Sequence, residues 1–375
     1  MSATAPMHCW LTAPLPEDVQ RALERLRRAD DVVQVAVMPD VHLAEDVCVG
    51  TVLATTHLLY PQAVGGDIGC GMLAVRFDVG ADLLRHPRRA ATLLHHLSET
   101  IPALMHPGPR ELPRGLVDQE LSHPRLERMK RWEGTREFAT LGRGNHFLEL
   151  QSDEQDALWL MVHSGSRALG PAIRAHHLQQ ATVHSGPLHA LELHDVTGAA
   201  YLADLAWALR FAEESRRAMA LQVAELMRAL FRVDIDEDTL FQCGHNHVRL
   251  EEHEGRDLLV HRKGAIPAAE GERGIVPGSM GSVSHHVRGR GCARALCSSA
   301  HGAGRRLSRS EARRRVSARK LLRQMEGVFF DGRLAEQLRD EAPEAYKDVR
   351  AVMRAQAELV AVERRLTPLL SYKGA

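Results

Sequence analysis

The clearest candidate for chemistry is a histidine in a glycine-containing segment near the C-terminal end of the chain. In residues 297–305, His301 is followed by Gly302 and Gly304, and Arg305 closes the segment. A neutral imidazole can attack phosphorus, glycine lets a backbone approach closely, and a guanidinium can neutralise phosphate. Histidine next to glycine is also common in ordinary turns. This segment alone therefore favours a nucleophile and a structural turn about equally.

A second glycine-rich segment, residues 64–71, combines a carboxylate with a thiol. Asp67 precedes Cys70 by three residues, so both side chains can converge on one ion. Carboxylate and thiolate together suit a borderline divalent metal such as manganese or zinc. Three further short turns contain imidazoles that could complete the coordination: His146, His163 and His245. A single histidine is usually structural, but this combination predicts a metal centre.

These segments, in this order, resemble the RtcB family of GTP-dependent RNA ligases. The resemblance runs from about residue 35 to the C-terminus, and several separate motifs in register are far more specific than any one of them. The other segments that carry it are residues 38–42, 261–265, 277–281 and 373–374.

The resemblance implies roles for individual residues. One manganese ion would be held by Cys70, His163 and His245, and a second by Asp67, Cys70 and His146. His301 would accept GMP from GTP. The implied contacts to GTP are Asn145, Glu149, Asn246, Ser279, Ser284, Tyr346 and Lys373. Our candidates for binding RNA or nucleotide phosphates are Arg167, Arg262, Lys263 and Arg305.

The implied activity is a GTP- and Mn²⁺-dependent RNA ligase of RNA repair or tRNA splicing. It would join 2′,3′-cyclic-phosphate or 3′-phosphate ends to 5′-hydroxyl ends, through a histidine–GMP and an RNA 3′-ppG intermediate. One alternative is a 3′-end guanylyltransferase or metal-dependent phosphodiesterase without efficient sealing. Another is a non-catalytic sensor of RNA ends.

Two positions depart from the family pattern. Residues 44–47 place Glu45 and Asp46 in a loop where the family usually has glycine and lysine. Ser215 stands where asparagine is expected. Because the metal ligands and His301 are retained, we interpret these departures as signs of altered RNA specificity.

Composition restricts the class of protein only loosely. The 375 residues contain 48 Lys and Arg against 48 Asp and Glu, so RNA contacts must come from local patches such as the arginine-rich residues 305–323. Six irregularly spaced cysteines are typical of a reduced intracellular protein. Without a leader-like N-terminus or a long apolar run, we expect a soluble, cytoplasmic protein and no membrane partner.

The elements that must position these residues follow from hydrophobic periodicity. Strands are predicted at residues 32–38, 51–55, 72–77 and 158–162, the last ending next to His163. Helical spacing predicts helices at 204–233 and 346–366, the second stopped by Pro368. Residues 103–135 are predicted to be a loop or lid. We expect one domain, residues 1–375. The resemblance implies an α+β fold, with mixed β-sheets flanked by helices around a central metal and nucleotide cleft.

Overall fold

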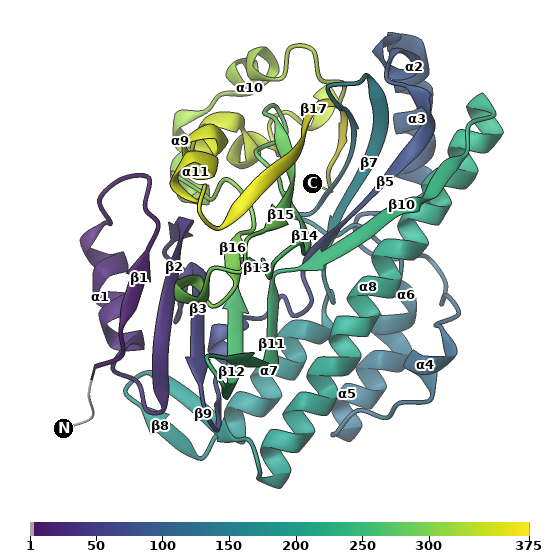
Figure 1. Cartoon of the computed structure of the whole chain (residues 1–375). Helices are drawn as coiled ribbons and strands as arrows, with labels where there is room; N and C mark the ends of the chain where they lie inside the picture. The colour runs from purple at the N-terminus through teal and green to yellow at the C-terminus, as the bar shows by residue number, and fades with distance from the viewer. Residues whose placement is uncertain (1–3, 375) are drawn as a thin grey trace.

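The computed structural model describes residues 4–374, and two large β-sheets meet near its centre (Figure 1). In the five-stranded sheet, β1 runs parallel to β2, and the other neighbours are antiparallel. Its strands, in spatial order, are β1 (Met7–Cys9), β2 (Val32–His42), β3 (Val49–Thr55), β12 (Arg256–Lys263) and β11 (Asn246–His253).

The second sheet has seven antiparallel strands and curls into a half-barrel (Figure 1). Its strands, in spatial order, are β10 (Ile235–Gly244), β5 (Gly71–Gly80), β7 (Ala157–Ser164), β6 (Phe147–Ser152), β17 (Val360–Tyr372), β15 (Ser284–Gly289) and β14 (Arg273–Val276). Smaller pairings join β13 (Ala265–Pro267) to β16 (Ser298–Ala300), and β4 (Leu58–Leu59) to β9 (Leu188–Glu192) and β8 (Val183–Ser185).

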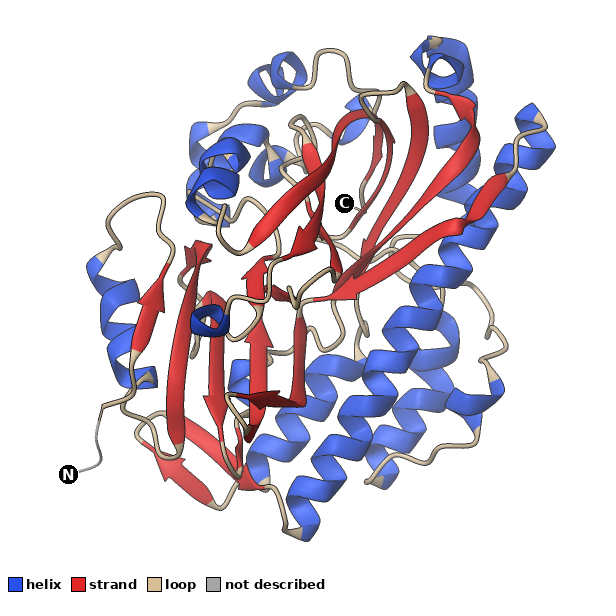
Figure 2. Cartoon of the chain, in the orientation of Figure 1, coloured by secondary structure: helices blue, strands red, loops and turns tan. Residues whose placement is uncertain are grey.

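Helices flank these sheets, as Figure 2 shows. The long α8 (Val196–Phe231) packs against β5, β7, α3 (Pro87–Thr100) and α7 (Leu169–Gln179). The remaining α-helices are α1 (Glu17–Leu26), α2 (Asp82–Arg85), α4 (Arg114–Val117), α5 (Pro124–Met129), α6 (Thr135–Glu137), α9 (Arg309–Arg315), α10 (Ala318–Gln324) and α11 (Val349–Ala355). Within residues 4–374, none of the helices has both the length and the apolar character needed to cross a membrane.

Within the half-barrel, strand β5 is apolar on both faces. Leu73 and Val75 of β5 belong to the core shared with α8, whereas Met72 and Ala74 belong to the core shared with the five-stranded sheet. Successive side chains of a strand point to opposite faces, so a strand buried on both sides needs a nearly continuous apolar sequence. The end of β5 next to the Asp67–Cys70 loop is thus packed between two hydrophobic cores, one on each face of the strand.

The four predicted strands are confirmed as β2, β3, β5 and β7, and the helix predicted at 204–233 is confirmed as the C-terminal part of α8. The predicted α+β class, with mixed sheets flanked by helices, is also confirmed. All six cysteines lie in the described part of the chain and are free thiols, as expected.

The helix predicted at 346–366 is wrong over most of its length. Only α11 is helical, and the chain from Val360 onwards is the strand β17. This strand pairs with β15 on one side and β6 on the other, and that pairing outweighs the helical spacing of its apolar residues. Pro368 lies inside β17 at a register shift, where a strand tolerates a missing N–H.

Residues 103–135, predicted to be a loop or lid, contain α4, α5 and a π-helical turn at Lys130–Gly134. This segment is docked on α8. The indole Nε1 of Trp207 donates to Leu116 O at 2.9 Å, and Ser122 Oγ donates to the buried Asp204 carboxylate at 2.6 Å. The high proline and arginine content of this segment favoured a loop prediction. Its short helices are stabilised mainly by their contacts with α8, which local sequence does not indicate.

Candidate metal and nucleotide site

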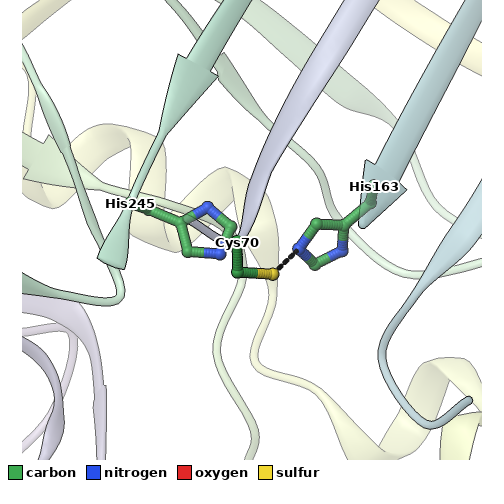
Figure 3. A group of neighbouring side chains, drawn as sticks. All are labelled: Cys70, His163 and His245. Atoms are coloured by element: carbon green, nitrogen blue, oxygen red, sulfur yellow. Dashed lines mark hydrogen bonds between the residues drawn. The ribbon is translucent and has the colours of Figure 1, made fainter. Parts of the chain in front are cut away.

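Four elements bring the predicted metal ligands together. Asp67 and Cys70 lie in the loop that precedes β5, and His163 lies near the end of β7. His146 immediately precedes β6, and His245 lies between β10 and β11. Cys70 stands between His163 and His245, and its Sγ is 3.2 Å from His163 Nε2 (Figure 3).

The ligands form two overlapping groups that share Cys70. Cys70, His163 and His245 form one, and Asp67, Cys70 and His146 form the other. Within each group the donor atoms lie within 4.8 Å of one another. His146 Nε2 is 3.4 Å from Cys70 Sγ and 3.0 Å from Asp67 Oδ2. These thiolate, imidazole and carboxylate donors, all buried except the half-buried Asp67, fit two borderline divalent ions that share the thiolate.

The orientation of His163 is set by a backbone contact. Its Nδ1–H donates to Asn145 O at 3.1 Å, because a carbonyl oxygen can only accept. The lone pair of Nε2 therefore faces Cys70. Such a contact to the other ring nitrogen is a regular feature of metal-binding histidines.

Burial sets the protonation of these groups. It lowers the pKa of His163 and of His245 well below the usual histidine value, so both rings are neutral, the form that binds metal. Burial also raises the pKa of the Cys70 thiol well above its usual value, and Asp67 adds to this rise. For Asp67, burial acts in the opposite direction to its neighbours, but His146 and Cys70 together bring its pKa down to about 2.

Residues outside the candidate ligand set position the Asp67–Cys70 loop. The buried guanidinium of Arg216, on α8, donates through NH1 to Gly69 O and Ser164 O, each at 2.8 Å. Asn246 donates from Nδ2 to Asp67 O at 2.9 Å. A side chain at Gly165 would collide with the Asp67 carboxylate, so only glycine fits there. No sequence pattern indicates this role of Arg216, because its partners are backbone carbonyls far away in the chain.

His301 follows β16 and is paired with a carboxylate from the five-stranded sheet. Its Nδ1–H donates to Oδ2 of Asp40 at 2.7 Å, and its backbone N–H donates to the same oxygen at 3.2 Å. Asp40 lies in β2 and is fully buried. In a neutral ring this contact leaves the lone pair on Nε2. Asp40 belongs to the segment 38–42 noted above, but sequence analysis assigned it no role.

One large cavity, of about 1380 Å³, joins His301 to the metal ligands. Cys70 and His146 lie buried behind its wall. The volume exceeds the range of about 300–1,000 Å³ that is usual for a single small ligand. The predicted site residues that line it are Asp67, Asn145, Glu149, His163, His245, Asn246, Lys263, Ser279, His301, Arg305, Tyr346 and Lys373.

Among the residues that line the cavity, Lys373 is hydrogen-bonded to a carboxylate that sequence analysis missed. Lys373 Nζ donates to Glu341 Oε2 at 2.9 Å, and the Tyr346 hydroxyl donates to the same oxygen at 2.7 Å. Burial raises the pKa of Glu149 to about 8, although Lys373 acts in the opposite direction. Ser284 does not line the cavity; it is buried on β15, where its hydroxyl accepts from Gln151 Nε2 at 3.2 Å.

Two of the four predicted phosphate-binding cations do not line the cavity. Arg262 is buried on β12, where it forms an ion pair with Glu251 and donates to Ser298 Oγ at 2.9 Å. Arg167 donates through NH2 to the backbone oxygens of Ala103 and Leu104. Both guanidinium groups therefore tie protein segments together.

Lys263 and Arg305 do line the cavity. Burial, and then the nearby Arg174, lower the pKa of Lys263 to about 8. Arg305 is held by Glu341, at 3.3 Å, and by the backbone oxygens of Leu307 and Asp340. The basic stretch 305–323 is partly neutralised, because Arg309 and Arg313 pair with Asp340 and Lys320 pairs with Glu344.

The two departures noted in the sequence have distinct surroundings. Asp46 forms an ion pair of 2.5 Å with Arg174 of α7, whereas Glu45 is exposed. Ser215 is buried in α8, and its hydroxyl accepts from Ala139 N at 3.0 Å. Of these side chains, Glu45 is the charged one that forms no ion pair within residues 4–374, and it lies near Lys263 of the cavity lining.

Comparison with known proteins gives one consistent description. A family model described as tRNA-splicing ligase RtcB matches residues 22–129 and 114–374. The chain is 34% identical to the RNA-splicing ligase RtcB of Escherichia coli (strain K12) over 403 aligned residues, which cover 99% of this chain and 98% of that protein.

More distant relatives carry the same description. The RNA-splicing ligase RtcB of Mycobacterium tuberculosis (strain ATCC 25618 / H37Rv) is 30% identical, with 90% of this chain and 96% of that protein covered. The tRNA-splicing ligase RtcB of Methanococcus maripaludis is 26% identical, with coverage of 84% and 82%.

Proposed function

The chain belongs to the RtcB family of RNA ligases, and from that premise and the cavity geometry we propose the reaction that it catalyses. The protein joins RNA ends bearing a 3′-phosphate or 2′,3′-cyclic phosphate to ends bearing a 5′-hydroxyl. It uses GTP and two Mn²⁺ ions, and it acts in RNA repair or tRNA splicing. The observation that carries this proposal is the Asp40–His301 pair, which opens onto the same cavity as the two metal-ligand groups.

The first step is transfer of GMP to His301. Nε2 attacks the α-phosphorus of GTP, an N–P bond forms, and the bond to pyrophosphate breaks. Asp40 holds the proton on Nδ1, so that the lone pair remains on Nε2. Two manganese ions, when bound by the two ligand groups, would neutralise the triphosphate and polarise its phosphate oxygens.

The second and third steps activate and seal the RNA. A 3′-phosphate oxygen of the RNA attacks the phosphorus of the His301–GMP adduct, which forms RNA 3′-ppG and releases the imidazole. The 5′-hydroxyl oxygen of the other strand then attacks the RNA phosphate, GMP leaves, and the hydroxyl proton passes to solvent. A cyclic phosphate must first be opened by water to a 3′-phosphate.

Nucleotide recognition is assigned to the end of the cavity that contains Glu149. A carboxylate can accept from guanine N1–H and the exocyclic amine, and Lys373 can donate to an acceptor of the base. Tyr346, Ser279 and Ser284 complete the proposed guanosine contacts. Ser284 would act indirectly, because its hydroxyl accepts a hydrogen bond from Gln151, which also donates to Glu149. Asn145 and Asn246, which also line the cavity, are proposed to contact the phosphates.

The proposed phosphate contacts come from cations whose side chains line the cavity. Lys263 and Arg305 line the cavity and are the cations proposed to meet RNA or nucleotide phosphates directly. Arg167 and Arg262 support the surrounding segments, and we propose for them an indirect role through those segments.

Covalent labelling with GTP tests the proposal. We expect wild-type protein incubated with manganese and α-labelled GTP to retain label after denaturation, and to lose it in acid but not in alkali, as a phosphoramidate does. His301→Ala should remain unlabelled, whereas His95→Ala, an exposed position on α3, should label normally. RNA supplied with a 3′-ppG end should be sealed in part by His301→Ala, because the step that needs the imidazole is already complete.

The other outcomes separate the alternatives. Nucleotide binding without any covalent label would identify a sensor of RNA ends. Label together with RNA 3′-ppG that persists after 5′-hydroxyl RNA is added would identify a guanylyltransferase without sealing. Label on a lysine would overturn the proposed nucleophile.

A further inference from the structure

Glu341 connects four side chains at the end of the cavity that we assign to the nucleotide. Its Oε2 accepts from Lys373 Nζ at 2.9 Å and from the Tyr346 hydroxyl at 2.7 Å. Its Oε1 accepts from Arg309 NH1 at 2.9 Å and from Arg305 NH1 at 3.3 Å. One carboxylate therefore uses both oxygens to hold three cations and a phenol.

Glu341 and the ammonium group that it binds are buried inside the protein. Its side chain is only 3% exposed, as is that of Asp340 before it, and Lys373 is 4% exposed. Burial raises the pKa of Glu341, but the nearby cations Lys373 and Arg309 outweigh that effect and lower it overall. Removing the charge of a buried, ionised carboxylate with four partners destabilises the folded state, because it leaves buried cations unpaired.

Lys373 also lies within the electrostatic reach of a second buried carboxylate, Glu149. Lys373 is the group that most strongly lowers the pKa of Glu149 against the effect of burial. The two oxygens of Glu149 already accept from Gln151 Nε2 at 2.9 Å and from Ser371 Oγ at 3.2 Å. The ammonium group of Lys373 is thus near two buried carboxylates, Glu149 and Glu341. In this structure it is hydrogen-bonded to Glu341.

We propose that Glu341 is a positioning residue for base selection: it holds Lys373 and Tyr346 in place and keeps Lys373 off Glu149, which leaves Glu149 free to accept from a guanine base. This inference rests on the proposed use of GTP. Without Glu341, the ammonium of Lys373 moves to Glu149 and occupies the oxygens that guanine N1–H and the exocyclic amine need. Adenine lacks N1–H and the 2-amino group, so its binding depends far less on Glu149.

The test compares nucleoside binding by two neighbouring acid-to-amide variants. Guanosine and adenosine are used as probes, because they carry no phosphate and need no metal. In Glu341→Gln, we expect the ratio of guanosine to adenosine affinity, measured by calorimetry, to fall at least tenfold. Asp340→Asn is the matched control: it removes the same charge one residue away, from a carboxylate that pairs with Arg309 and Arg313 but makes no hydrogen bond to Lys373 or Tyr346. Its ratio should stay within about twofold of wild type.

A second variant distinguishes positioning from general damage. In a Glu149→Gln background, Glu341→Gln should change the guanosine-to-adenosine ratio far less than it does in the wild-type protein, because no carboxylate remains at position 149 for Lys373 to occupy. If Glu341→Gln does not fold, Glu341→Asp decides, because its shorter carboxylate keeps the charge but loses reach, and its ratio should fall at least threefold.

The outcomes are separable. A wild-type protein that does not prefer guanosine over adenosine would contradict the proposed function itself. A wild-type preference that survives unchanged in Glu341→Gln, or in Glu341→Asp where that variant decides, would overturn the inference alone. A fall in the ratio that is equally large in the Glu149→Gln background would also overturn it.

Discussion

Asp40 and His301 are 261 positions apart in the chain, and their side chains are joined by a hydrogen bond of 2.7 Å between Oδ2 and Nδ1. Asp40 comes from β2 of the five-stranded sheet, and His301 follows β16, which pairs with β13. The buried carboxylate selects one tautomer of the ring. This pairing turns an ordinary histidine into a candidate nucleophile with its lone pair on Nε2.

Replacing Asp40 by Asn should therefore slow transfer of GMP to His301 by roughly 10²–10⁴-fold, because the amide no longer selects the reactive tautomer. The rate of covalent labelling by GTP measures the effect. GTP binding should change little, since Asp40 does not line the cavity. Asp46→Asn is the control near the cavity, because Asp46 pairs with Arg174 and does not contact His301. Labelling of Asp40→Asn at the wild-type rate would show that the carboxylate does not orient the ring.

Cys70→Ala should lower manganese content from two ions per chain to one or none, because the thiolate belongs to both ligand groups. Metal analysis after dialysis measures this loss directly, and GMP transfer should be abolished. Cys9→Ala and Cys292→Ala change cysteines outside both groups and should leave metal content and activity nearly unchanged. Two ions retained by Cys70→Ala would refute a shared thiolate, and full activity with zinc alone would refute manganese.

Guanosine affinity should rise with pH until about pH 8. Burial raises the pKa of Glu149 to about 8, so the free protein holds this carboxyl protonated at pH 7, whereas accepting from guanine N1–H requires the ionised form. Below pH 8 the affinity should rise by about tenfold per pH unit, since each unit changes the ionised fraction tenfold. The same shift means that Glu149 destabilises the free protein as pH rises from its unfolded value towards 8.

Calorimetry between pH 6 and 8.5 checks this dependence. The charged and titratable groups near Glu149 are Lys373 and, beyond it, Glu341 and Tyr346. Glu149→Gln cannot ionise, so it should bind guanosine weakly and with no such slope. A wild-type affinity that does not change with pH would mean that Glu149 is not the acceptor for the base.

Replacing Glu45 by Lys should tighten RNA binding, because Glu45 is exposed beside the cavity and has no cation partner within the described residues. The new lysine can neutralise one phosphate, so the slope of log affinity against log salt should steepen by about 0.7 for single-stranded RNA. Covalent labelling by GTP should be unaffected. Glu252→Lys, exposed on β11 away from the cavity lining, is the control. Equal affinities and slopes for both variants would place the 44–47 loop away from RNA.

The grouping of the candidate metal ligands is the feature that could be predicted most fully from the sequence. Asp67 and Cys70 are close in the chain, and each histidine sits in a short turn beside a strand, so residue type and local spacing already indicated the donor set. His163 illustrates the reason: a continuous apolar run predicts the strand β7, and the end of a strand has a well-defined position.

Tertiary structure alone decided which side chains remain free to act. Arg262 and Arg167 looked like phosphate-binding groups, but Glu251 and the backbone of residues 103–104 occupy their donors. Glu341 drew no attention in the sequence, yet it holds Lys373, Tyr346 and two arginines. The C-terminal segment has helical spacing but forms β17, because two neighbouring strands offer it hydrogen bonds. Local periodicity and motif spacing are properties of a few adjacent residues, whereas the partner of a charge or a strand is chosen by contacts between segments far apart in the chain.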